Sequence, residues 1–197
     1  MKKYLIALTI LILMSSLSLA EEWHIKKSKD NLVKFTSSTT LLDFDGITDQ
    51  IDGYIYWEGE EVFGKNNEVY FEVDLNSVET GIGKRDRDMR EDVLHTDKYP
   101  KTSFRGQIIS VDQDPNNSVK YNIVSKGKMF LHGHEKEMEV KAVITKQNET
   151  MQVIANFSVL LKDYDIEAPS LMAFIKVAEE IKLHLDFQLE KMAENKN

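Results

Sequence analysis

The chain lacks cysteine, and this absence excludes several classes of protein. With no thiol among its 197 residues, the chain cannot form a disulfide framework, a cysteine-ligated zinc or iron–sulfur site, or a catalytic cysteine. Glycine and proline are also scarce, with 9 and 3 residues, which argues against a disordered or linker-rich chain. The length fits one domain or at most two small ones.

Basic side chains are outnumbered by acidic ones. The chain has 25 lysines and arginines against 33 aspartates and glutamates, a formal net charge of −8. Nucleic acids and anionic membrane surfaces attract proteins with a basic surface, so we expect neither as a partner. Beyond residue 20 no apolar run approaches the about 20 residues that a membrane span requires. Stable insertion into a membrane is therefore not expected.

The N-terminal segment has the layout of a secretory signal peptide. Two lysines follow Met1, residues 4–13 are almost continuously apolar, and Ser18 and Ala20 supply small side chains where a signal peptidase cuts. The apolar core is about 10 to 16 residues long, too short for a membrane anchor. We predict a signal peptide over residues 1–20 and a single domain over 21–197. The product would be periplasmic or secreted, with a net charge of −10.

Apolar and polar residues alternate with a period of two along most of the remaining chain. Such alternation is typical of strands with one face in an apolar interior and the other in water. We count about eight such strands, and their length favours a closed antiparallel barrel over two stacked sheets. The segments that carry the alternation are 33–36, 50–57, 68–75, 104–108, 121–131, 138–144, 151–159 and 181–189.

Two stretches break the alternation and predict short helices. Residues 84–94 are rich in arginine and aspartate, and Met89 and Val93 lie four residues apart, as on one side of a helix. Residues 169–180 begin with Pro169, a residue favoured at helix starts, and contain several apolar side chains. In an all-β barrel, we expect these two helices to cover the ends, where a ligand would enter a hollow interior.

No motif in the sequence predicts an enzyme. The chain has neither a Gly-x-Ser-x-Gly elbow nor a phosphate-binding loop with the required spacing. His132, His134 and Glu135 could form a metal site, although Gly133 between the histidines indicates a solvated hairpin tip. The acidic residues of 86–92 could bind a hard cation such as calcium, although the arginines between them favour ion pairs on a solvated helix face. We therefore expect no catalytic residue, metal or cofactor, and keep a metal-assisted enzyme acting on a lipid as an alternative.

Several motifs resemble the YceI family of exported polyisoprenoid-binding proteins. They are SVETGIGKRD at 77–86, DKYP at 97–100, GKMFLHG at 127–133 and ANF at 155–157. The similarity covers roughly residues 23 to 190. It implies a lipocalin-like barrel whose interior holds a long apolar chain, such as a polyisoprenoid, a quinone tail, or a fatty acid or amide. It implies binding or transport without catalysis, and it also allows a homodimer.

The predicted ligand-binding residues are large apolar side chains that the alternation turns inward, together with those of the two helices. They are Phe35, Phe71, Val73, Phe104, Met129, Leu131, Phe157 and Phe187 from the strands, and Met89, Val93, Met172 and Phe174 from the helices. Arg85 is predicted either to contact a polar head group or to anchor the first helix. The remaining alternative is a ligand-free structural or stress-related module in which the same side chains form a filled core.

Overall fold

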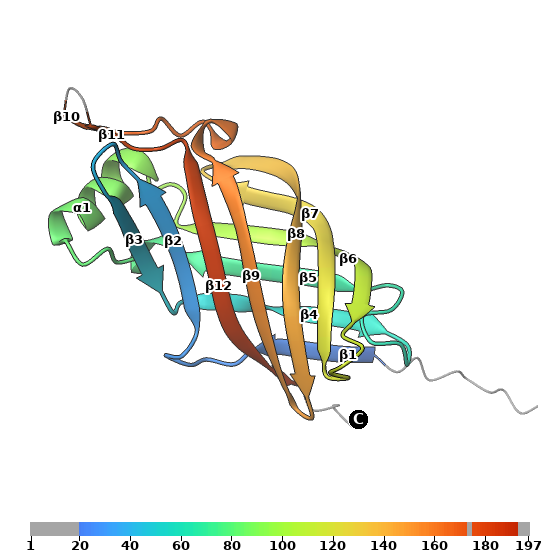
Figure 1. The fold of residues 1–197 in the computed structure, drawn as a ribbon. Helices are drawn as coiled ribbons and strands as arrows, with labels where there is room; N and C mark the ends of the chain where they lie inside the picture. Colours follow the sequence, from blue (N-terminus) through green and yellow to red (C-terminus); the bar gives the residue numbers. More distant parts are fainter. Residues whose placement is uncertain (1–19, 173–174, 193–197) are drawn as a thin grey trace, which may run out of the picture.

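The main architectural element is one antiparallel sheet of ten strands (Figure 1). The computed structural model describes residues 20–172 and 175–192, so the predicted signal peptide, apart from Ala20, lies outside the described residues. The strands of this sheet are β1 (Ala20–Ile25), β2 (Leu32–Ser38), β3 (Asp43–Thr48), β4 (Ile51–Glu58), β5 (Glu68–Asp74), β6 (Lys101–Gln113), β7 (Lys120–Leu131), β8 (His134–Gln147), β9 (Thr150–Leu160) and β12 (Glu180–Lys191).

Eight of these strands close into a barrel. The order β1-β4-β5-β6-β7-β8-β9-β12 returns to its start because β1 pairs with both β4 and β12. Trp23 lies opposite Ile55 on one side and opposite Lys191 on the other. The predicted all-β, eight-stranded antiparallel barrel is therefore confirmed. The eight predicted strands include β2, however, and do not include β1 or β3.

The strand β12 has two different partners, and this opens one end of the barrel. Its last residues pair with β1, whereas Lys182–Asp186 pair with β2, which continues into β3. The far edge of β3 forms an isolated bridge between Ile47 and Glu79. Here the β2–β3 hairpin lies beside the short helices η1 (Leu75–Ser77) and α1 (Gly83–Asp88) (Figure 1). We call this region the mouth.

The barrel interior contains two packed clusters of apolar side chains. The first is centred on Trp23 and Trp57, whose stacked rings lie 6.3 Å apart and whose side chains are at most 1% exposed. It extends through Ile55, Phe63 and Phe187 and fills the end that β1 closes. The second cluster comprises Leu75, Met129, Leu131, Val159, Leu161, Tyr164 and Ile166. Each cluster is well buried, and side chains of both border the cavity described below.

The first predicted helix is confirmed. α1 continues directly into a π-helical stretch, Met89–Val93, so the helical region closely matches the predicted range 84–94. Val93 packs against the second apolar cluster, as expected for the apolar side of this segment. Within the described residues, no helix is long and apolar enough to cross a membrane.

The second predicted helix, over residues 169–180, is wrong. This stretch contains the short antiparallel strands β10 (Ser170–Met172) and β11 (Ile175–Lys176). The backbone then pairs with β2, because Val177 bridges to Thr39 and the Ala178 amide donates to the Ser38 carbonyl at 2.8 Å. Apolar spacing over so short a stretch fits either period, and the tertiary partner offered by β2 overrides the helical preference.

Candidate functional site

An apolar cavity of about 110 Å³ lies inside the barrel beside the mouth. Its walls come from η1 and from strands on all sides of the barrel, and almost all of the lining atoms are apolar. The lining residues are Val33, Phe35, Gly46, Ile51, Phe71, Val73, Leu75, Val78, Thr102, Ser103, Phe104, Met129, Phe157, Leu183 and Leu185.

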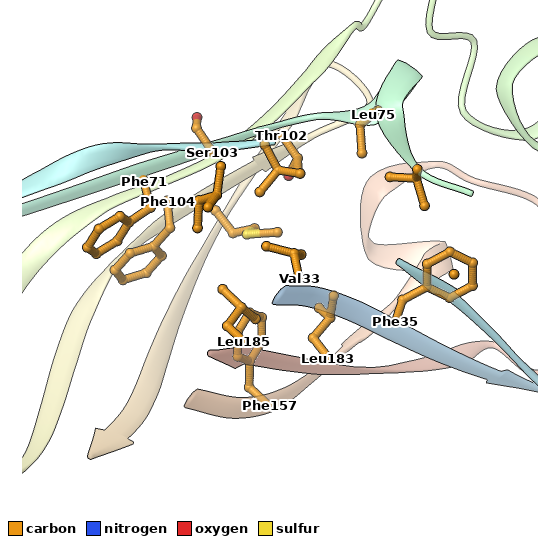
Figure 2. Close-up of a pocket in the computed structure, with 15 residues that line it drawn as sticks. Val33, Phe35, Phe71, Leu75, Thr102, Ser103, Phe104, Phe157, Leu183 and Leu185 are labelled. Atoms are coloured by element: carbon orange, nitrogen blue, oxygen red, sulfur yellow. The ribbon is translucent and has the colours of Figure 1, made fainter. Parts of the chain in front are cut away.

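The cavity separates opposing walls of the barrel (Figure 2). Phe71 and Phe104 lie on one side, whereas Leu185 and Phe157 lie on the other. These side chains face the interior yet are only half-buried, because part of their surface borders the empty space. Below them, the ring of Phe71 contacts that of Phe187 at a centroid distance of 4.9 Å. The cavity therefore has a packed floor and half-buried walls.

A stack of three side chains leads from the cavity to α1 at the mouth. Phe35 on β2 lines the cavity and lies over Gly46 of β3, where any side chain would collide with its ring. The rings of Phe44 and Phe35 are perpendicular to each other, with their centroids 6.1 Å apart. The Arg85 guanidinium lies 4.6 Å from the centre of the Phe44 ring. This mouth stack, consisting of Phe35, Phe44 and Arg85, connects the cavity to α1.

Arg85 also holds the N-terminal part of α1 in place. Its Nε donates to the Thr80 hydroxyl and its Nη2 to the Thr80 carbonyl, both at 2.8 Å. The side chain therefore makes the contacts expected of helix anchoring, one of the two roles predicted for it. A contact between Arg85 and a ligand head group stays a prediction.

Asp86 completes this anchor. It is 7% exposed, and its carboxylate accepts a hydrogen bond from the Thr80 amide at 2.8 Å and another from the Thr80 hydroxyl. The bond from the Thr80 side chain is the largest influence, and together with the amide bond and nearby Arg90 and Arg85 it lowers the pKa of Asp86 below its ordinary value. The anchor is therefore strongest with Asp86 ionised.

Replacing Asp86 with asparagine is expected to lower the free energy of unfolding by about 1–2 kcal/mol at pH 7. Because the folded pKa is depressed, the contribution is complete above the unfolded pKa of about 3.9 and is lost as the pH falls through the folded value. Urea denaturation at pH 7 and near pH 3 measures this difference. The matched control is Asp88→Asn on the same helix, and an equal loss at both pH values would contradict the assignment.

The structure brings half of the predicted ligand-binding residues to the cavity. Leu131 and Phe187 are instead buried in the two clusters, and Met89 and Val93 are half-buried on the helical segment. Phe174 and the side chain of Met172 lie outside the described residues. The predicted residues that line the cavity are Phe35, Phe71, Val73, Phe104, Met129 and Phe157.

Several lining residues were not selected from the sequence. Val33, Leu183 and Leu185 belong to the same alternating strands as the selected residues, and their inward positions are visible in the pattern. The selection favoured the largest side chains, although a cavity forms where side chains do not reach one another. Ile51 also occupies an inward position in an alternating segment. Leu75 is the last residue of such a segment, but in the structure it belongs to η1.

The two histidines of the suspected metal site are separated by a tight turn. Leu131 pairs with His134, so His132 and Gly133 form a two-residue loop, with φ values of +51° and +80°. His134 is exposed, but His132 is only 9% exposed, donates from Nδ1 to the Tyr164 carbonyl at 3.1 Å, and has its Nε2 2.9 Å from His95. Among the described residues, no three side chains of metal-ligating type are grouped.

Solved structures with the same fold support the architecture. BcnA of Burkholderia cenocepacia superposes with a TM-score of 0.67 at 14% identity, covering 83% of this chain and 98% of its own. A polyisoprenoid-binding domain from Saccharophagus degradans, implicated in plant cell wall breakdown, gives 0.64 at 15% identity, covering 89% and 99%. The YceI protein of Campylobacter jejuni gives 0.55 at 15% identity, covering 76% and 85%.

The family of the chain follows from its sequence match. No curated protein matches the chain. The YceI-like domain matches residues 23–189, a range that includes nearly every barrel strand, the mouth stack and all the cavity-lining residues. The protein therefore belongs to the YceI family.

Proposed function

We propose that this protein is exported and holds a long apolar chain inside its barrel for transport or storage. The cargo would be a polyisoprenoid, a quinone tail, or a fatty acid or amide. The observation that carries the proposal is the apolar cavity at the mouth, bordered by half-buried Phe71, Phe104 and Leu185. Family membership supports it, as does the description of the similar Saccharophagus degradans domain as polyisoprenoid-binding.

The cost of the cavity argues against a purely structural role. An unfilled apolar void destabilises a protein by about 24 cal/mol per Å³, because the lining atoms lose packing contacts. For a void of about 110 Å³, this amounts to at most about 2–3 kcal/mol, because the cavity is partly open and the figure applies to an enclosed void. A structural module would gain stability from larger side chains at these positions. A ligand that fills the space recovers those contacts and so accounts for the void.

The size of the cavity indicates how a long chain would be held. An apolar cavity of about 150 Å³ binds benzene, so one of about 110 Å³ has room for roughly one five-carbon isoprene unit. A longer chain would have to displace the mouth stack or extend past it. Burial contributes about 0.8 kcal/mol per methylene, or roughly 4 kcal/mol per isoprene unit before the costs of association. The first unit would thus anchor the rest.

The polar groups near the cavity favour a carrier over an enzyme. The Thr102 hydroxyl, one of the few polar groups in the wall, donates to the Phe130 carbonyl at 2.7 Å. The turn separates His132 from His134, so the arrangement suspected for a metal-assisted enzyme is not assembled. Export is supported by the signal-peptide layout of residues 1–20.

A series of prenyl alcohols of increasing length tests the binding proposal. A ligand that binds only the folded protein raises the melting temperature. We expect the rise to grow with chain length and to level off once the cavity and the mouth are filled. Thermal unfolding with an equal concentration of each alcohol measures this dependence, with a short polar alcohol as the control. The absence of a shift with every apolar chain would contradict the proposal.

A further inference from the structure

Among the described side chains, four large apolar ones are exposed around the mouth. Leu41 and Leu42, in the turn between β2 and β3, are 72% and 58% exposed. Ile47 on β3 is 50% exposed, and Ile82, immediately before α1, is 54% exposed. Single exposed apolar residues are ordinary, but a group on adjoining segments marks an interaction surface. We call these four residues the apolar rim.

The segments that carry the rim adjoin one another. Ile47 exchanges two backbone hydrogen bonds of 2.9 Å with Glu79, three residues before Ile82. Figure 1 shows α1 beside β3 at the end of the barrel where the β2–β3 turn also lies. Ile109 is also 54% exposed, but it belongs to β6 and not to the segments that carry the rim. The amide of its neighbour Ile108 donates to Asn67 in the β4–β5 loop.

The rim continues the apolar lining of the cavity. Gly46 lines the cavity, and the next residue, Ile47, faces outward. On the other side of the mouth, Val78 lines the cavity and the next residue, Glu79, pairs with Ile47. The rim therefore lies just outside the part of the wall that Gly46 and Val78 form, and a chain leaving the cavity past the mouth stack would reach it.

The backbone of the β2–β3 turn is suited to an environment without hydrogen-bonding partners. The Thr39 hydroxyl accepts from the amides of Leu41 and Leu42 at 3.2 and 3.1 Å and donates to the Leu42 carbonyl at 2.8 Å. The Leu42 carbonyl also accepts from the Thr39 amide at 2.9 Å. Lipid requires backbone groups to be satisfied internally, whereas a protein that adds a strand needs them free. The β2–β3 turn is therefore better suited to contact with lipid than to pairing with a strand of another protein.

The charge around the rim indicates the kind of lipid surface. Residues 78–94 contain four basic and five acidic side chains, and the β2–β3 hairpin over residues 38–48 adds two acidic side chains and no basic one. Lys84, with a side chain 75% exposed, follows Ile82 closely but pairs with Asp88. A surface without an excess of basic side chains does not attract anionic lipids, which the net charge of the chain would also repel.

We propose that the apolar rim docks the mouth onto the surface of a neutral lipid bilayer. An apolar chain then passes between the bilayer and the cavity without exposing its methylene groups to water. Docking stands on the rim alone, whereas the passage of a chain rests on the proposed function.

The double variant Leu41→Ser/Leu42→Ser tests docking with vesicles of phosphatidylcholine. Losing two insertable leucines is expected to reduce the partition coefficient, measured by vesicle flotation, by about 10- to 100-fold. Ile109→Ser, which removes an equally exposed side chain away from the mouth, is the matched control and should partition like the wild type. Unchanged partitioning of the double variant, or an equal loss in the control, would overturn the proposal.

A second measurement separates docking from ligand binding. In the absence of vesicles, the double variant is expected to bind a short prenyl alcohol with wild-type affinity, because neither leucine lines the cavity. A wild type that binds the alcohol but does not float with vesicles would overturn docking alone. Flotation without binding of any alcohol would support docking and contradict the proposed function. Self-association through the rim, with no flotation, would also overturn docking.

Discussion

Replacing Gly53 with alanine is expected to lower the free energy of unfolding by about 3–5 kcal/mol. Gly53 lies within β4 with a φ of +143°, a conformation that side-chain-bearing residues rarely adopt. An added Cβ would also collide with the Tyr70 carbonyl oxygen and lie 2.7 Å from the Phe71 Cα on β5. Because both obstacles are backbone atoms, relief requires separating β4 from β5. Urea denaturation measures the loss.

Two other glycines separate the causes of this effect. Gly59 has a φ of +92°, but an added Cβ would have nothing within 4 Å. Gly59→Ala should therefore show backbone strain alone, about 1 kcal/mol. Gly83, at the start of α1, also has open space and no such φ, so Gly83→Ala should be close to neutral. If Gly53→Ala were no more destabilising than Gly59→Ala, close contact between β4 and β5 would not be the cause.

Replacing Val33 with phenylalanine is expected to weaken the binding of an apolar chain by about 100-fold or more. Val33 borders the cavity and pairs with Leu185 across β2 and β12. The added ring would occupy much of a space of about 110 Å³ and displace roughly one isoprene unit, worth about 4 kcal/mol gross. Filling the void should leave the free energy of unfolding unchanged or higher. Titration calorimetry and urea denaturation measure the two quantities.

The adjacent residue provides the matched control. Lys34→Phe adds the same ring to the same strand, but on the outer face, where Lys34 lies 3.5 Å from the carboxylate of Asp45. Losing this partly exposed ion pair costs little, and we expect wild-type affinity. If Val33→Phe folded and bound as tightly as the wild type, the ligand would have to lie elsewhere than in this cavity.

Alternation was sufficient to predict the barrel but not all of its strands. On β3, Phe44 and Gly46 occupy inward positions, and the glycine is required there because the Phe35 ring fills the space of a side chain. β3 therefore shows no apolar alternation in its sequence, because one of its inward positions is filled by a side chain of the neighbouring strand β2. β1 presents Trp23 and Ile25 within six residues, too short a run to be distinguished beside the predicted cleavage site.

The wrong helix had a nonlocal cause. Its apolar residues do have a spacing compatible with a helix, but Ser38 and Thr39, more than 130 residues earlier in the chain, provide backbone partners for Val177 and Ala178. Sequence spacing does not show whether the edge of a distant strand is available.

The sequence predicted which side chains face the interior, but not where empty space remains between them. Alternation identifies which side chains face inward, and Phe71, Phe104 and Phe157 were correctly placed on the interior. Whether an inward side chain meets another one depends on how strands distant in sequence are spaced around the barrel. Phe187, at 2% exposure, is therefore packed in the core below the cavity, whereas the smaller Val33 borders the cavity.

Native mass spectrometry of the detergent-free protein, followed by extraction and identification of any bound molecule, tests the central claim most directly. The protein should be isolated from cells that export it, with Val33→Phe prepared in parallel. We predict that the wild type carries a long-chain apolar molecule and that Val33→Phe carries far less. A wild type without a bound molecule, which also takes up no added prenyl alcohol, would contradict the account.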